Sequence, residues 1–141
     1  MDRELKRKFP NLVDLSRKTS EEDEKYNCIA WAFGHTNKIW WPAKAPRVHW
    51  PISYKGLTTM QAFQAWLTHD GWEGTLDATF DPKFKKIALY TLYGEPTHAA
   101  KLIGDGTWSS KLGLFIDLSH TLADLVGPEY GSVFGIYRKA A

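Results

Sequence analysis

Three apolar segments separated by two turns, within residues 86–113, constrain the fold of this chain most strongly. Residues 86–93 are rich in aliphatic and aromatic side chains and predict a central strand. The Gly-Glu-Pro sequence of residues 94–96 predicts a turn, and residues 97–103 are predicted to form the antiparallel neighbour. A Gly-Asp-Gly hairpin turn then leads into a third strand that ends at Gly113. This part of the chain therefore predicts an antiparallel sheet.

The strongest amphipathic helix is predicted ahead of these strands, over residues 58–71. Thr58 or Thr59 caps its N-terminus, and Gly71 ends it. His69, near its C-terminal end, is predicted to be structural because a positive charge there suits the helix dipole. The apolar residues of the helix fall on one stripe that faces a core, namely Met60, Phe63, Trp66 and Leu67.

Two more elements are predicted near the end of the chain. Ser119 caps a short helix that ends at Leu125 or Val126, and residues 132–138 form a closing strand. Helices come first and antiparallel strands follow, so we expect an α+β fold with N-terminal helices packed on an antiparallel sheet.

Length and composition favour a single domain. The 141 residues, of which 43% are hydrophobic, suffice for one substantial core. We expect residues 26–141 to form this domain and residues 1–25 to form an N-terminal arm. The arm would dock through its apolar cluster, which consists of Phe9, Leu12, Val13 and Leu15.

Charge, hydropathy and cysteine count argue against several classes of protein. The net charge is only +2, with basic and acidic residues mixed, so a nucleic-acid partner is not expected. No apolar run approaches the roughly 20 residues needed to cross a bilayer, and residues 1–8 lack the apolar segment of a secretory signal. A single cysteine cannot form an internal disulfide and favours a reducing, cytoplasmic location. Cys28, His98 and His120 lack the close spacing of a zinc site, so we expect neither metal nor cofactor.

The only cysteine lies within residues 26–34, Tyr-Asn-Cys-Ile-Ala-Trp-Ala-Phe-Gly. Asn27 is a good N-cap and Gly34 suits the left-handed residue that closes a short helix, so Cys28 is predicted as the first helical residue. The helix dipole and the free backbone N–H groups there would favour the thiolate and stabilise an oxyanion. The alternative is that Cys28 is a small buried core residue.

A long proline-rich loop follows, over residues 35–55, and contains Trp40 and Trp41. The loop either forms the wall of a substrate site or simply covers the core together with Trp50. Most of the seven tryptophans are expected in the core, whereas exposed ones would offer a stacking surface. The candidate substrate-binding residues are Tyr26, Trp40, Trp41 and Trp108.

His98 is the natural partner for the cysteine, because imidazole has the pKa of a general base and this residue opens a strand directly after a turn. It would therefore lie at the end of the sheet, facing the start of a packed helix. This order of Tyr-Asn-Cys helix, histidine strand, Gly-x-Gly hairpin and further polar residue resembles the papain-like cysteine peptidase superfamily, in particular its compact bacterial cell-wall endopeptidase branch. The resemblance covers roughly residues 26–113 and implies a papain-like fold.

The resemblance also implies roles for individual residues. Cys28 would be the nucleophile and His98 the base, with the Cys28 backbone N–H and the Tyr26 side chain near the oxyanion. Ser110 stands where the family has a His, Asn or Asp that orients the imidazole. His120 and Asp117 are therefore alternative orienting residues. The family also has an acidic residue where this chain has Asn27.

A second resemblance, carried by residues 40–42, 96–100 and 108–113, is to a family of small bacterial proteins and implies no particular reaction. Two functions are therefore expected. The first is a thiol hydrolase or acyltransferase that acts on an amide bond of a peptide or peptidoglycan-like substrate through Cys28 and His98. The second is a non-catalytic binding module of the same fold, in which the tryptophan-rich loop holds a protein or glycan partner. The sequence leaves the oligomeric state open.

Overall fold

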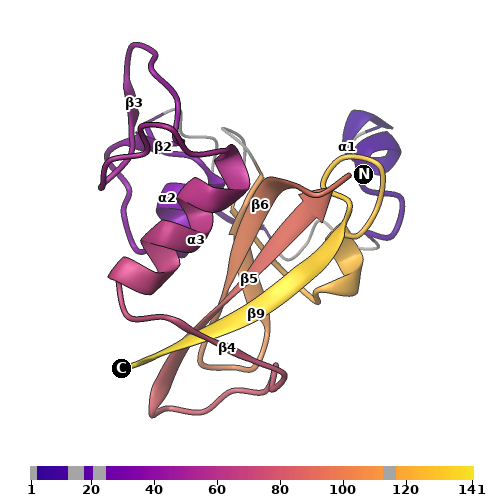
Figure 1. The fold of residues 1–141 in the computed structure, drawn as a ribbon. Helices are drawn as coiled ribbons and strands as arrows, with labels where there is room; N and C mark the ends of the chain where they lie inside the picture. The colour runs from indigo at the N-terminus through magenta and orange to yellow at the C-terminus, as the bar shows by residue number, and fades with distance from the viewer. Residues whose placement is uncertain (1–2, 13–17, 21–24, 113–116) are drawn as a thin grey trace.

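A seven-stranded sheet, with every neighbouring pair antiparallel, is the centre of the fold (Figure 1). The computed structural model describes residues 3–12, 18–20, 25–112 and 117–141. The strand order is β1-β8-β7-β6-β5-β9-β4. Its members are β1 (Lys18–Ser20), β4 (Glu73–Thr75), β5 (Phe84–Leu92), β6 (Glu95–Leu102), β7 (Trp108–Lys111), β8 (Asp117–His120) and β9 (Ser132–Ala140). With the helices described next, this sheet confirms the predicted α+β class.

Helices α2 (Cys28–Ala32) and α3 (Thr59–His69) lie next to each other, away from α1 (Arg3–Lys8) (Figure 1). They bury one face of the sheet in a cluster that includes Ile29, Phe63, Leu67, Ile87 and Leu89. The predicted stripe of α3 is confirmed at Phe63, Trp66 and Leu67, and Thr58 forms the predicted cap as part of a capping box with Gln61.

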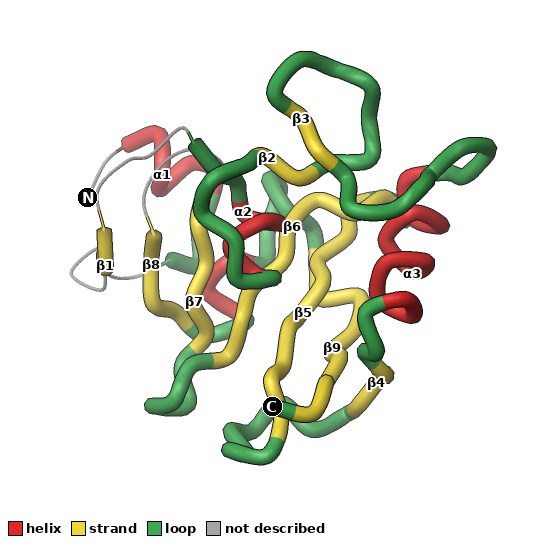
Figure 2. The backbone as a smooth tube through the Cα atoms, turned by 90° about the vertical axis from the view of Figure 1, so that its left-hand side faces the viewer, coloured by secondary structure: helices red, strands yellow, loops and turns green. Residues whose placement is uncertain are grey.

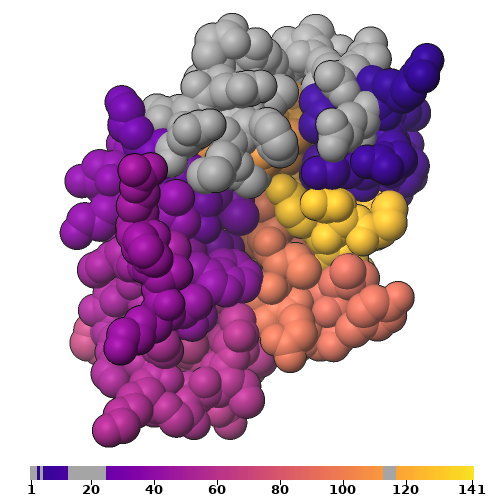
Figure 3. Space-filling model, turned by 90° about the horizontal axis from the view of Figure 1, so that it is seen from above, coloured from indigo at the N-terminus to yellow at the C-terminus, as the bar shows by residue number. Residues whose placement is uncertain are grey.

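The other face of the sheet carries a second cluster, which includes Ala88, Tyr90, Ala100, Leu118 and Leu125. The N-terminal arm packs there as predicted, because Phe9 and Leu12 are both buried in this cluster. The ring of Phe9 lies 5.0 Å from that of Tyr130, and Asn11 Nδ2 donates to the Val126 carbonyl. Figure 3 shows the indigo arm lying against the yellow segment that leads to β9. Val13 and Leu15 lie outside the described residues.

The turn between β5 and β6 differs from the predicted one. Tyr93 and Gly94 both have positive φ values, 51° and 78°, so these two residues make the turn and β6 already begins at Glu95. Pro96 lies inside β6 and pairs with Thr91, next to an irregularity at which the step from Tyr90 to Thr91 on β5 faces the two steps from His98 to Pro96 on β6. A strand tolerates proline at such a position because the hydrogen-bond ladder is already interrupted there.

The predicted helix from Ser119 is wrong. Ser119 belongs to β8 and pairs with Ser109 of β7, and only a short 3₁₀ turn, η2 (Ala123–Leu125), follows. Just before this turn, the Thr121 N–H donates to the Asp124 carboxylate at 2.9 Å and the Asp124 N–H donates to the Thr121 hydroxyl at 3.3 Å.

The tryptophan-rich loop is mostly irregular, as its prolines predict, but it contains the short parallel pair β2 (Ile39–Trp40) and β3 (Val48–His49). The chain between β2 and β3 projects away from the sheet (Figure 1 and Figure 2). This loop is attached to the body of the domain by Asn27, described below.

Candidate functional site

Asn27 positions the candidate nucleophile. Its side-chain oxygen accepts from the Ala30 backbone N–H at 3.1 Å, which confirms the predicted N-cap, and Cys28 is the first residue of α2. The same oxygen accepts from the Trp40 N–H at 2.9 Å, while Asn27 Nδ2 donates to the Trp40 carbonyl at 2.8 Å. Asn27 therefore joins the cysteine helix to the tryptophan-rich loop, a second role that sequence reasoning missed.

Cys28 is only 6% exposed, and burial raises the pKa of its thiol to about 12. Backbone N–H groups of Ala99, Ile29 and Cys28 itself, together with the charge of Lys111, lower the pKa but do not offset burial. The N–H groups of the helix start are thus present as predicted, yet the thiol is not activated. Desolvation outweighs the helix terminus here.

His98 lies on the opposite face of the sheet from α2. Ala99 belongs to the cluster that contains Cys28, whereas the His98 ring stacks on Tyr130 of the other cluster, with centroids 4.0 Å apart and planes at 8°. Successive side chains of a strand point to opposite faces of the sheet. Ala99 points toward Cys28, so the neighbouring residue His98 points away from it. In the described part of the chain, His98 Nδ1 has no hydrogen-bond partner. The predicted contact between the Cys28 sulfur and the His98 ring is therefore not made in this structure.

Ser110 and His120 do lie beside His98, as expected for its orienting residues. Ser110 Oγ is 2.8 Å from His98 Nε2 and 2.6 Å from His120 Nε2. His120 Nδ1 lies 2.6 Å from the Thr121 carbonyl, which can only accept, so His120 Nδ1 carries a proton. The Ser110 hydroxyl bridges the two rings, because its one proton and its lone pairs let it donate to one histidine Nε2 and accept from the other.

All three side chains of this network are buried. Burial, and next the nearby His120, lower the pKa of His98 well below its usual value. The network is therefore closed to solvent in this structure.

Tyr26 and Asp117 lie on the cysteine side instead. Tyr26 Oη donates to Asp117 Oδ2 at 3.0 Å, so Asp117 does not orient His98. The ammonium of Lys111 lies 4.5 Å from the centre of the Tyr26 ring, and Lys111 is completely buried. Sequence reasoning missed Lys111. The alternation of side chains along a strand could have indicated its position. Lys111 is two residues after Ser109, so both side chains lie on the face of the sheet on which α2 packs.

The tryptophans are placed mainly in the core. Trp40 is 4% exposed and stacks between Phe33 and His35, with centroids 5.9 and 4.7 Å away. Trp41 is half-buried and meets Phe63 edge-on, and Trp108 is buried in the cluster on the other face. The rings of Trp40 and Trp108, both predicted to bind substrate, are thus buried and not accessible in this structure.

The outer side of the tryptophan-rich loop carries a hollow of about 580 Å³, which we call the basic hollow. It is lined by Lys25, Asn37, Lys38, Ile39, Arg47, Val48 and His49. None of these described lining residues is acidic. The backbone of Arg47 is left-handed, with φ of 66°. Sequence reasoning missed this site because its basic residues are dispersed along the chain and meet only when β2 pairs with β3.

Among the residues that the structure describes, no group of three or more His, Cys, Asp or Glu side chains is placed to hold a metal ion. Within the same ranges, none of the helices has the length and apolar character needed to cross a membrane.

Comparison with known proteins gave one match. No curated protein and no solved structure matches the chain. The family model described as Domain of unknown function (DUF7689) matches residues 17–138. This match includes α2, α3, all of the sheet except the last two residues of β9, and both Cys28 and the basic hollow, and the chain belongs to this family.

Proposed function

We propose that this domain is a non-catalytic binding module of papain-like arrangement, and that its basic hollow holds an acidic protein segment. The papain-like arrangement is supported by α2, which starts at Cys28 and packs on β6, the strand that contains His98. The single free thiol, with no disulfide to hold the fold, supports a cytoplasmic place of action.

The charge of the basic hollow is the observation that carries the proposal. Lys38 and Arg47 both line it, and no described lining residue is acidic. Carboxylates are the protein groups that pair with such a surface, and a guanidinium binds them in a bidentate manner.

The support beneath the hollow is rigid. Trp40 and Trp50 lie in the core, and Asn27 fixes the Trp40 backbone through two hydrogen bonds. Arg47 keeps a left-handed backbone, a conformation that costs about 1–2 kcal/mol for such a residue and is common at binding sites. A preformed surface loses little entropy when a partner binds.

A labelled hexaglutamate peptide tests the proposal by fluorescence anisotropy at several salt concentrations. We expect saturable binding that weakens with salt, and a loss of about tenfold in affinity when Lys38→Gln and Arg47→Gln are combined. The matched control combines Lys55→Gln and Lys83→Gln, which remove two exposed positive charges outside the hollow. An equal loss in the control, or no saturable binding, contradicts the proposal.

A thiol hydrolase or acyltransferase that acts on an amide bond through an acyl-thioester on Cys28 is the second candidate. One observation favours it: the N–H groups around the Cys28 sulfur and the Lys111 charge all stabilise negative charge there. Its base would have to reach the sulfur from a conformation other than this one.

The rate of Cys28 alkylation by iodoacetamide near neutral pH separates the two candidates. A buried thiol with a pKa of about 12 reacts much more slowly than a free-cysteine standard. A faster rate than the standard, lost in His98→Ala, would support the hydrolase and contradict a non-catalytic module.

A further inference from the structure

A second concave site lies on the helix side of the sheet, apart from the basic hollow and from Cys28. Its volume is about 630 Å³, and it is lined by the C-terminal ends of α2 and α3, by β5 and β6, and by residues of the loop between β4 and β5. We call it the aromatic pocket.

Flat side chains form much of its wall. Phe33 meets Trp66 and Trp72 edge-on, with ring centroids 5.9 and 5.8 Å apart. Phe80 and Phe84 line the pocket from the β4–β5 loop and the start of β5, and Phe80 is 44% exposed. Such walls favour a planar, apolar ligand group.

The charges in the pocket are unequal. Four lysines line it, at positions 85, 86, 101 and 139, whereas Asp70 is the only acidic side chain among the described lining residues. Asp70 is already engaged, because its carboxylate is 3.1 Å from Lys139 Nζ and accepts from Trp72 Nε1 at 2.9 Å. The acidic side chain therefore does not neutralise the remaining lysines.

Among the four lysines, Lys101 is the partly buried one whose ammonium has no carboxylate or carbonyl partner within the described residues. It is half-buried, and its Nζ lies 3.6 Å from the centre of the Trp31 ring. Within the described residues its ammonium makes no salt bridge or hydrogen bond. Burial lowers the pKa of Lys101, and the more distant Asp117 opposes that shift. An anion beside this partly buried ammonium would gain more electrostatic interaction energy than an anion beside a fully solvated lysine.

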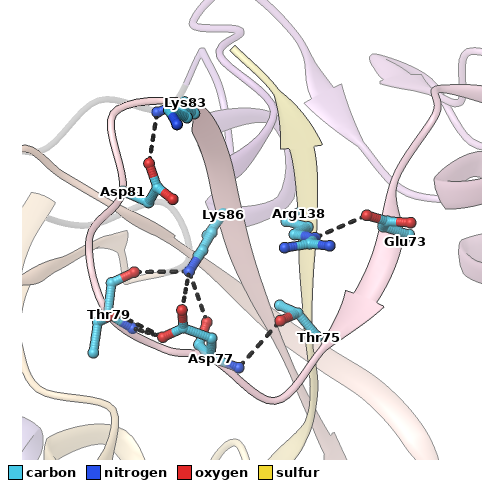
Figure 4. Close-up of polar contacts among 8 residues, drawn as sticks. All are labelled: Glu73, Thr75, Asp77, Thr79, Asp81, Lys83, Lys86 and Arg138. Carbon is cyan, nitrogen blue, oxygen red and sulfur yellow. Dashed lines mark hydrogen bonds and ion pairs between the residues drawn. The ribbon is translucent and has the colours of Figure 1, made fainter.

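The loop that contributes Phe80 is held in place (Figure 4). Lys86 Nζ donates to the Asp77 and Thr79 carbonyls at 2.9 and 2.8 Å, and lies 3.4 Å from Asp77 Oδ2. Asp77 Oδ1 accepts from the Thr79 N–H at 2.9 Å and from its hydroxyl at 2.6 Å. The wall is therefore formed before any ligand arrives, and Lys86 is used for this purpose.

From this geometry we propose that the aromatic pocket binds a small organic anion, an aromatic carboxylate, with its ring against Phe33, Trp72 and Phe80 and its carboxylate near Lys101. Aromatic walls supply the apolar contact, and the partly buried ammonium of Lys101, which has no salt-bridge partner among the described residues, selects the negative charge. The site is separate from the basic hollow, so it does not depend on the function proposed above.

Titration of the full chain with 2-naphthoate, followed by the indole N–H signals in NMR spectra, tests the proposal. The neutral 2-naphthamide is the matched probe. We expect 2-naphthoate to shift the Trp66 and Trp72 signals and to bind about tenfold more tightly than 2-naphthamide. Equal affinity for the two probes overturns the selection of an anion, and the absence of saturable shifts with 2-naphthoate overturns the site.

Variants separate the two contributions. Lys101→Gln should lower the affinity for 2-naphthoate about tenfold and that for 2-naphthamide by less than about twofold. Lys55→Gln, the same charge change at an exposed position outside the pocket, should alter neither. Phe80→Ala should lower the affinity for both probes about fivefold, whereas Phe134→Ala, at an exposed position of β9, should not.

If Lys101→Gln does not fold, Lys85→Gln at the exposed lysine of the pocket should show the same selective loss of 2-naphthoate affinity in weaker form. Retention of full 2-naphthoate affinity in both Phe80→Ala and the lysine variant overturns the proposal.

Discussion

His98 makes stability depend on pH at the scale of a single residue. Its pKa in the folded protein is well below the ordinary value of 6.5, because the ring is buried, so only the unfolded chain gains this proton near pH 6. Stability should therefore fall as the pH drops below about 6.5, with a slope approaching 1.4 kcal/mol per pH unit for this group. Denaturant unfolding at pH 7, 6 and 5 measures the slope.

His98→Gln should flatten that slope, although it will also lower stability at pH 7 by disturbing the bond to Ser110. His69→Gln, which changes an exposed histidine of α3, is the control and should leave the slope unchanged. An unaltered slope in His98→Gln would show that other groups are responsible.

The candidate catalytic pair shows what sequence can and cannot supply at this scale. The cap at Asn27, the position of Cys28 in α2 and the strand of His98 were all predictable, because each depends on local sequence. The face to which His98 points was not, since a shift of one residue in register exchanges the two faces of a strand. In the structure His98 pairs with Tyr90, in step with Ala99 opposite Leu89 and Ala100 opposite Ala88, and this register sets its face.

Among the elements, the segment that leads into β9 depends on one glycine. Gly131 has φ of 78°, and a Cβ atom there would lie 1.9 Å from the Thr91 carbonyl oxygen. Gly131→Ala should therefore lower the free energy of unfolding by about 3 kcal/mol or more, from backbone strain together with the clash. Thermal or denaturant unfolding measures the change.

Gly56→Ala provides the matched control, because Gly56 has a similar φ of 76° with nothing within 4 Å of the added atom. It should cost only about 1 kcal/mol, from the left-handed backbone alone. Equal losses in the two variants would contradict a steric role for Gly131.

Elements with strong local signals were predicted, and those that depend on distant partners were not. The capped stripe of α3, the turn around Gly106 and the closing strand β9 all follow from residues close in sequence. Strands β2, β3 and β4 are only two or three residues long. They are strands because each pairs with a partner, which for β4 is β9, far along the chain. Patterns this short carry no period that could predict them.

For the whole molecule, the sheet separates two apolar clusters and with them two sets of buried polar groups. The histidine network lies on the arm side, whereas Cys28, Lys111 and the pair Tyr26 and Asp117 lie on the helix side. Both proposed binding sites lie outside these buried groups, one on the projecting loop and one at the ends of α2 and α3. Because the two binding sites do not include the buried polar groups, a ligand can bind at either site without opening the core.

The N-terminal arm contributes to the apolar cluster on the second face of the sheet. Phe9 is 2% exposed and packs on Tyr130, whose ring stacks on His98, so the arm covers the second cluster. Phe9→Ala should lower the free energy of unfolding by about 3–5 kcal/mol, because it leaves a cavity in that cluster. Phe134→Ala, at a side chain that is 49% exposed, should cost less than about 0.5 kcal/mol.

Circular dichroism and tryptophan fluorescence should report a single shared unfolding transition in Phe9→Ala. An arm that folds independently would instead give a separate early transition and leave the main one unchanged.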